Sequence, residues 1–203
     1  DIHVADPQYN SERIIELMEQ GSTRGVKVMA FPELCLTAYT CSDLFLQESL
    51  LREAKKELKR ILQASKSKDM ILFVGMPWMH KGKLYNVAAV LNRGRILGIV
   101  PKKHLPNYSE FYELRHFNPG MEKVEMTDWE GVQVPMGMNL LFACRTMPEL
   151  VLAAELCEDV WVPCPPSISH ALAGATVIAN CSASDETTGK DQYRYNLICG
   201  QSA

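Results

Sequence analysis

Two apolar runs joined by a short polar connection constrain the fold of this chain most strongly. Residues 84–91 (LYNVAAVL) and 95–100 (RILGIV) are rich in residues that favour strands, and the tripeptide Asn-Arg-Gly lies between them. A connection this short that contains glycine indicates a β-hairpin. Just before it, the run at 70–76 (MILFVGM) predicts a buried strand. Because a hairpin supplies antiparallel neighbours, the pattern disfavours a purely parallel, doubly wound sheet.

The rest of the chain contains segments whose apolar residues have helical spacing and short apolar runs typical of strands. Asn10 or Ser11 can cap a first helix, and apolar residues at helical spacing predict a second helix over 49–64. Further strands are expected at 26–31, 150–156 and 176–180, and a closing helix at 190–202. This mixture predicts an α/β protein with helices packed on the faces of a sheet.

The segment 106–139 has a different composition from the rest. It is rich in Pro, Gly, Tyr and charged residues and shows no sustained period. This composition predicts surface loops, with one short helix near 110–115. Long loops often carry binding residues, so we expect part of a functional site in this segment.

The composition is that of one soluble globular domain with a sizeable core. The 203 residues are 47% hydrophobic and 22% charged, with a formal net charge of -3. A nearly balanced charge gives no general attraction to nucleic acid or to anionic membranes. No apolar stretch is long enough to span a bilayer, and the chain opens with no signal-like segment. We therefore expect a cytoplasmic protein with neither nucleic-acid nor membrane partners.

The seven cysteines are an odd number and form no CxxC pair. This usage argues against a secreted disulfide framework and favours reduced, mostly buried thiols. Cys157, Cys164, His170 and Cys181 lie within one stretch of chain, but their spacings do not match the paired ligands of structural zinc sites. We therefore expect no metal site.

Three residues far apart in the chain each follow an apolar run: Glu33 in FPEL, Lys102 in VPKKHL and Cys157 in AELCEDVW. A strand that ends at such a point can deliver a side chain into a cleft. A cysteine sulfur can attack a carboxamide carbon, a carboxylate can take and return the thiol proton, and an ammonium can stabilise the resulting oxyanion. The three residues therefore predict chemistry on an amide bond.

Taken in order, the segments FPEL, PKKHL and ELCEDVW resemble those of the nitrilase superfamily of carbon-nitrogen hydrolases. Further segments are similar to the glutaminase domain of glutamine-dependent NAD synthetases, namely LTAYTCSDLF, LPNYSEFYELRHF, CEDVWVPCPPS, ALAGATVIANCSAS and GKDQYRYNLICGQSA. The resemblance covers nearly the whole chain. It implies an α-β-β-α sandwich in which glutamine is hydrolysed to glutamate and ammonia.

The same resemblance implies that residues 1–203 form a partial glutaminase domain. The opening DIHVADPQYN looks like the loop after a first strand, and QSA stops before the last strands that the family has. The ATP-dependent synthetase domain normally carries an SGGxDS-type loop, which this chain lacks. We therefore expect no cofactor in this chain, with ATP and Mg²⁺ in a synthetase domain of the same polypeptide, and assembly into a homo-oligomer.

The resemblance also assigns roles to the three central residues. Cys157 is the expected nucleophile, Glu33 the general base and then general acid, and Lys102 the oxyanion stabiliser together with the backbone N–H of Glu158. Lys103 is the alternative lysine, but the family places the catalytic lysine three residues before the leucine of PKKHL, which selects Lys102.

Four further residues match substrate-binding positions of the family. Glu113 matches a second glutamate that positions the substrate or the lysine. Tyr108 and Ser184 match contacts to the amino-acid end of glutamine, and Lys190 falls where relatives place a basic residue near the substrate carboxylate. With Glu158, these residues complete the expected binding site.

Three other functional hypotheses remain. The triad defines the reaction type better than the substrate, so a stand-alone amidase or nitrilase is the first alternative. The second is a structural, oligomerising module without activity. A thiol redox function is the third, and it lacks a CxxC pair or an evident resolving partner for Cys157. No GxGxxG, GxxxxGK[ST] or GxSxG motif supports a dinucleotide fold, a P-loop enzyme or a serine hydrolase.

Overall fold

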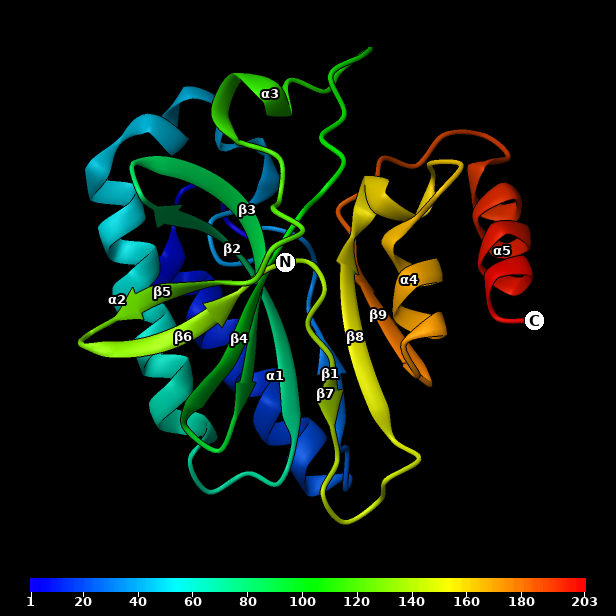
Figure 1. Cartoon of the computed structure of the whole chain (residues 1–203). Coiled ribbons are helices and arrows are strands. Elements are labelled where there is room, and N and C mark those ends of the chain that lie inside the picture. The colour runs from blue at the N-terminus through cyan, green and yellow to red at the C-terminus, as the bar shows by residue number, and fades with distance from the viewer.

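The computed structural model describes residues 1–203 and shows two sheets packed face to face between two layers of helices (Figure 1). Helices α1 (Pro7–Thr23) and α2 (Glu48–Ser65) cover the outer face of a six-stranded sheet. Helices α4 (Pro166–Leu172) and α5 (Lys190–Gln201) lie beyond a three-stranded sheet. The expected α-β-β-α sandwich is therefore confirmed.

The larger sheet is mixed and has the strand order β1-β2-β3-β4-β6-β5. Its strands are β1 (Val28–Ala30), β2 (Ile71–His80), β3 (Lys83–Asn92), β4 (Arg95–Pro101), β5 (Glu125–Trp129) and β6 (Val132–Met136). Strands β2, β3 and β4 are antiparallel neighbours, whereas β1 runs parallel to β2 and β6 parallel to β4. The predicted hairpin is confirmed, because Asn92 pairs with Arg95 across the turn.

The strand pair β5–β6 corrects the expectation of loops over 106–139. Trp129 and Val134 are buried, and Trp129 stacks on Trp78 of β2 with ring centroids 5.7 Å apart. The turn between the two strands places Glu130 and Gly131 at positive φ, a geometry that suits a tight hairpin. The short helix expected in this segment is α3 (Glu113–His116).

The first helix begins earlier than expected. Asp6, and neither Asn10 nor Ser11, caps α1 by accepting the backbone N–H of Tyr9 at 3.0 Å. Pro7 opens the helix, where its missing N–H costs nothing. Asn10 is instead buried inside the helix and donates to the carbonyl of Leu36.

The smaller sheet consists of β7 (Phe142–Ala143), β8 (Val151–Leu156) and β9 (Val177–Cys181). β7 is antiparallel to β8, and β9 is parallel to it, with Leu156 opposite Cys181. The strands expected at 150–156 and 176–180 and the closing helix are thus confirmed.

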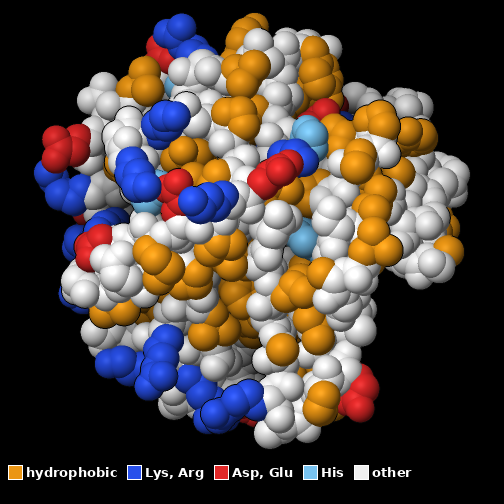
Figure 2. Space-filling view, viewed as in Figure 1, with side chains coloured by type: hydrophobic (Ala, Val, Ile, Leu, Met, Phe, Trp, Pro, Cys, Tyr) orange, Lys and Arg blue, Asp and Glu red, His pale blue; other side chains and the backbone are white.

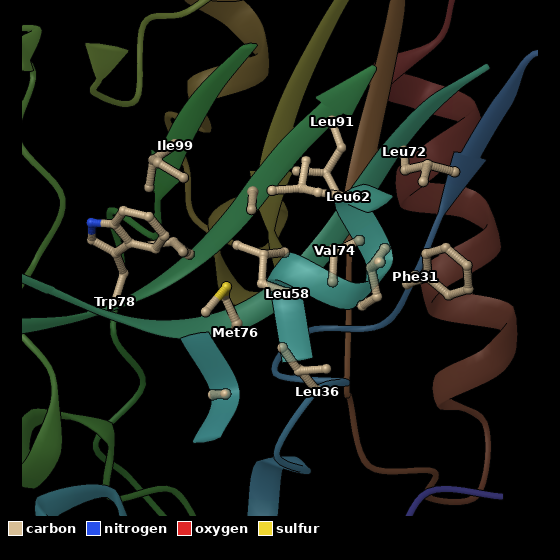
Figure 3. Close-up of a cluster of buried hydrophobic side chains, with 14 of the residues drawn as sticks. Phe31, Leu36, Leu58, Leu62, Leu72, Val74, Met76, Trp78, Leu91 and Ile99 are labelled. Atoms are coloured by element: carbon tan, nitrogen blue, oxygen red, sulfur yellow. The ribbon is translucent and has the colours of Figure 1, made fainter. Parts of the chain in front are cut away.

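Two apolar clusters hold the layers in place. The larger one lies between the helices and the six-stranded sheet, where Leu58 and Leu62 of α2 face Val74 and Leu91 (Figure 3). A smaller cluster fills the space between the two sheets and includes Phe73, Val100 and Leu156. Burial of this apolar surface fixes the ends of β1, β4 and β8 relative to one another.

The surface differs between the two halves of the sandwich. On the face shown in Figure 2, basic side chains gather mainly over the half that holds the six-stranded sheet, whereas apolar side chains lie over both halves. The exposed apolar side chains on α4 and α5 include Ile168, Leu172 and Ile198. No helix in the structure has the length and apolar character needed to cross a membrane.

Candidate active site

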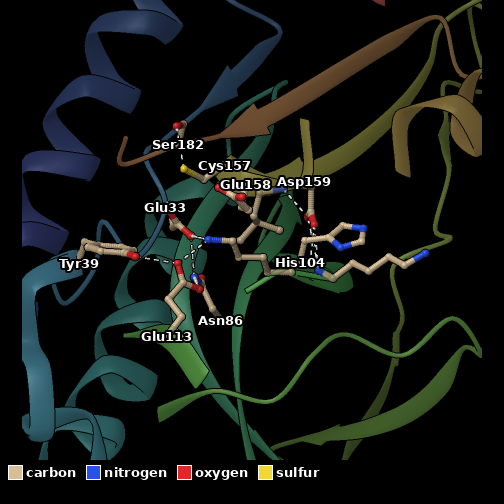
Figure 4. Close-up of polar contacts among 12 residues, drawn as sticks. Glu33, Tyr39, Asn86, His104, Glu113, Cys157, Glu158, Asp159 and Ser182 are labelled. Atoms are coloured by element: carbon tan, nitrogen blue, oxygen red, sulfur yellow. Dashed lines mark hydrogen bonds and ion pairs between the residues drawn. The ribbon is translucent and has the colours of Figure 1, made fainter. Parts of the chain in front are cut away.

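The three residues singled out for amide chemistry all follow the ends of strands. Glu33 comes three residues after β1, Lys102 directly follows β4, and Cys157 directly follows β8. Figure 4 shows Glu33 and Cys157 pointing toward one region between the two sheets. The cores described above therefore bring together side chains that are far apart in the sequence.

Cys157 lies at a sharp turn where β8 passes into the 3-10 helix η2 (Cys157–Val160). Its φ is 40°, in a region that non-glycine residues rarely occupy. The Ser182 hydroxyl donates a hydrogen bond to the Cys157 sulfur at 3.3 Å. Burial, followed by the charge of Glu33, raises the pKa of the Cys157 thiol to about 12. At neutral pH the sulfur is a thiol, so its attack on a carbonyl requires a base.

Lys102 is fully buried between two carboxylates. Its Nζ donates to Glu33 Oε1 at 2.6 Å and to Glu113 Oε1 at 2.5 Å. Burial alone would lower the pKa of Lys102, but the charges of Glu33 and Glu113 raise it above its ordinary value. Lys102 therefore carries a fixed positive charge at this site.

One carboxylate oxygen of Glu33 accepts hydrogen bonds, and the other has no hydrogen-bond partner. Oε1 accepts from Lys102 and from Asn86 Nδ2, the latter at 2.7 Å. Oε2 is buried and has no hydrogen-bond partner. Burying a carboxylate oxygen without a hydrogen-bond partner costs free energy, and Oε2 is available to accept a proton.

Glu113 is part of this charged cluster rather than a helix-surface residue. Its Oε1 also accepts from the Tyr39 hydroxyl at 2.7 Å, and its Oε2 from Asn86 Nδ2 at 3.4 Å. Burial and the nearby charge of Glu33 raise the pKa of Glu113. The amide of Asn86 thus donates to both carboxylates, which reduces their mutual repulsion.

The other expected residues lie around the cluster. Tyr108 is 55% exposed, and its hydroxyl contacts both carboxylate oxygens of Glu158 at 3.0 Å. Lys190 pairs with Asp185. Ser184 contacts the Asp185 carbonyl at 3.4 Å, so neither Ser184 nor Lys190 is hydrogen-bonded to the cluster.

The lysine next in sequence is separate from the cluster. The Lys103 Nζ reaches Glu122 at 3.2 Å, and its side chain is partly exposed. The geometry therefore favours Lys102 over Lys103 as the buried cation beside Cys157.

Sequence reasoning did not identify four residues of the site: Tyr39, Asn86, Asp159 and Ser182. Asn86 left one signal, because it is the polar residue within the otherwise apolar run LYNVAAVL. The others depend on contacts between distant segments. No group of three or more His, Cys, Asp or Glu side chains is arranged to hold a metal ion.

Comparisons with known proteins show which sequences and structures this chain is similar to. The sequence profile of the carbon-nitrogen hydrolases matches residues 2–197. A glutamine-dependent NAD(+) synthetase of Mycobacterium tuberculosis is 40% identical over 200 residues, which are 98% of this chain and 30% of that protein. One of Aquifex aeolicus is 33% identical over 195 residues, 96% of this chain and 31% of that protein. The chain therefore spans about three tenths of the length of these relatives.

Solved structures show the same relationship. A glutamine-dependent NAD(+) synthetase from Cytophaga hutchinsonii superposes with a TM-score of 0.88 at 27% identity, covering 99% of this chain and 32% of that one. An amidase from Nesterenkonia has a TM-score of 0.72 at 19% identity, covering 98% of this chain and 67% of that one. At that identity the amidase indicates a shared fold alone.

Proposed function

This chain belongs to the carbon-nitrogen hydrolase family, and we propose that it hydrolyses the side-chain carboxamide of glutamine to glutamate and ammonia. The observation that carries the proposal is the buried Lys102 cation held by Glu33 beside the Cys157 thiol, with Glu33 Oε2 free to take a proton. The names of the relatives support glutamine as the substrate.

In the proposed reaction, Glu33 removes the thiol proton as the Cys157 sulfur attacks the amide carbon. Lys102 and the backbone N–H of Glu158 stabilise the oxyanion of the tetrahedral intermediate. Glu33 then returns its proton to the departing ammonia, which leaves a γ-glutamyl thioester. Water, deprotonated by Glu33, attacks the thioester carbonyl, and its proton passes back to the sulfur as glutamate leaves.

The residues around the cluster are proposed to hold the amino-acid end of glutamine. Tyr108 and Glu158 already contact each other at 3.0 Å and present a hydroxyl and a carboxylate. Ser184, whose hydroxyl contacts the Asp185 carbonyl at 3.4 Å, is proposed to join them. Lys190 is paired with Asp185, so its part in binding the substrate carboxylate requires that pair to open.

The relatives are longer than this chain, and we propose that residues 1–203 act as the glutaminase portion of such a protein. The ammonia would then pass to an ATP- and Mg²⁺-dependent synthetase domain of the same polypeptide, which amidates nicotinic acid adenine dinucleotide to NAD. Cytoplasmic location and assembly into a homo-oligomer stay predictions.

The test measures ammonia release from glutamine, asparagine, simple aliphatic amides and nitriles by this chain. We expect glutamine to be preferred, Cys157→Ala to abolish turnover, and the matched control Cys164→Ala, at an exposed cysteine, to keep it. Turnover of simple amides or nitriles in preference to glutamine would favour the stand-alone amidase or nitrilase. Turnover that survives Cys157→Ala would overturn the mechanism, and a folded chain without turnover would favour the inactive module.

A further inference from the structure

We infer that Asp159 is a positioning residue that ties the Cys157 turn to the segment carrying Lys102. The inference rests on the proposed function, because it concerns the alignment of the proposed nucleophile with the proposed oxyanion stabiliser. Asp159 lies in η2, two residues after Cys157, and is 1% exposed.

The Asp159 carboxylate binds backbone groups from both segments (Figure 4). Oδ1 accepts the N–H of His104 at 2.8 Å and that of Lys103 at 3.2 Å. Oδ2 accepts the N–H of Leu156 at 3.0 Å and, at the longer distance of 3.4 Å, that of Lys103. Lys103 directly follows Lys102 in the chain, and Leu156 directly precedes Cys157. One side chain therefore joins the ends of β4 and β8, which belong to different sheets.

Local capping explains only part of this arrangement. An acidic side chain near the start of a helix often bonds back to the N–H of the capping residue, as Asp159 does with Leu156. The bonds to Lys103 and His104 cross between segments more than fifty residues apart and serve no cap. Burial raises the pKa of Asp159 to about 7, although the N–H groups of His104 and Leu156 favour its charged form.

An amide cannot replace this carboxylate. Both Asp159 oxygens face N–H donors, and the ionised carboxylate, which predominates above its pKa of about 7, accepts from both sides. Asparagine has one acceptor oxygen and one NH₂ group that only donates. Whichever way the amide turns, its NH₂ faces another donor, and either the Leu156 N–H or the His104 N–H loses its acceptor. Asp159→Asn thus uncouples the segments with almost no change in side-chain volume.

The uncoupling should act on alignment more than on substrate binding. A displacement of about 1 Å in a reacting group can cost on the order of a hundredfold in rate. We expect the kcat of Asp159→Asn for glutamine to fall by about tenfold to a hundredfold, with KM changed by less than about threefold. The released turn also exposes the sulfur, which is now buried, so alkylation of Cys157 by iodoacetamide should become about tenfold faster, equivalent to one unit of thiol pKa.

The matched control is Glu57→Gln. Glu57 is also 1% exposed, but it lies in α2, where its carboxylate accepts from Ser11 and Arg60 and contacts no residue of the site. This variant loses a buried carboxylate, so it should be destabilised while keeping kcat within about twofold and an unchanged rate of Cys157 alkylation. A merely structural role for Asp159 would make the two variants behave alike.

The experiment measures kcat, KM, the rate of iodoacetamide labelling at Cys157 by intact mass, and thermal unfolding for wild type and both variants. Asp159→Ser, whose small side chain leaves room for water, replaces the Asn variant if that variant does not fold. A folded Asp159 variant with wild-type kcat and labelling overturns the inference. Failure of both Asp159 variants to fold, with Glu57→Gln folded, also overturns it in favour of a role in stability. A folded wild type that does not hydrolyse glutamine refutes the proposed function instead, and the labelling ratio then decides the role of Asp159 by itself.

Discussion

Replacing Lys102 with methionine removes the cation from the buried cluster while keeping most of the side-chain volume. In the structure, Lys102 and Glu33 have completely buried side chains, and that of Glu113 is 4% exposed. The substitution leaves two carboxylates facing each other without a positive charge. Removing one partner of a buried ion pair costs about 3–5 kcal/mol, because the remaining charge is uncompensated.

The expected loss in the free energy of unfolding for Lys102→Met is therefore about 4 kcal/mol at pH 8. Folded proteins are stable by only about 5–15 kcal/mol, so this loss is large. Burial and Glu33 already raise the pKa of Glu113, and loss of the cation raises it further. A carboxyl group whose pKa is raised on folding contributes stability below its unfolded pKa, and this stability is lost as the pH rises through the folded pKa. The defect should therefore be smaller at pH 5 than at pH 8.

The assay is urea unfolding monitored by far-UV circular dichroism. Variants are compared when the unfolding free energy depends on urea concentration with the same slope. The double variant Lys102→Met/Glu113→Gln removes one of the stranded carboxylates and should recover about 2 kcal/mol relative to Lys102→Met. A loss below about 1 kcal/mol for Lys102→Met at pH 8 would refute this reasoning. The reasoning would also be refuted if the losses in unfolding free energy of Lys102→Met and Glu113→Gln, measured singly, added up to that of the double variant.

Three further predictions concern the proposed chemistry. Glu33→Gln cannot accept a proton, so kcat for glutamine should fall by about 10²–10⁴-fold; a loss below about tenfold would remove Glu33 as the base. Because the pKa of Cys157 is about 12, its alkylation by iodoacetamide should accelerate about tenfold per pH unit from about pH 7 to 9, and a plateau in that range would contradict the assigned environment. Tyr108→Phe loses the hydroxyl that contacts Glu158 and should raise KM for glutamine by about tenfold; an unchanged KM would remove Tyr108 from the binding site.

The sequence predicted the strands that carry the site because their apolar runs end abruptly at polar residues. Pro32 and Pro101 mark two of these ends, directly before Glu33 and Lys102. The strand pair β5–β6 was missed because its exposed positions mix apolar Met126 and Val132 with polar Asp128. This mixture obscures the alternation that buries Thr127 and Trp129. Short strands of this kind acquire their order from the sheet edge that they join.

The partners of the central residues could not be predicted in the same way. Asn86 stands in β3 and reaches two carboxylates from different segments, and Asp159 binds a backbone segment more than fifty residues away. Such contacts depend on the relative position of the two sheets, which no local pattern encodes. The start of α1 could have been predicted from the sequence. Asp6 followed by Pro7 is a stronger start signal than Asn10 or Ser11, and it was overlooked.

The central claim is that Cys157 is the nucleophile of a site that recognises glutamine. Its most direct test is the intact mass of the protein after treatment with a glutamine analogue that carries an electrophile at the γ-position, compared between wild type and Cys157→Ala. We predict a single adduct on wild type that excess glutamine blocks and that Cys157→Ala does not form. A folded wild type without an adduct, or an adduct that persists in Cys157→Ala, would contradict the claim.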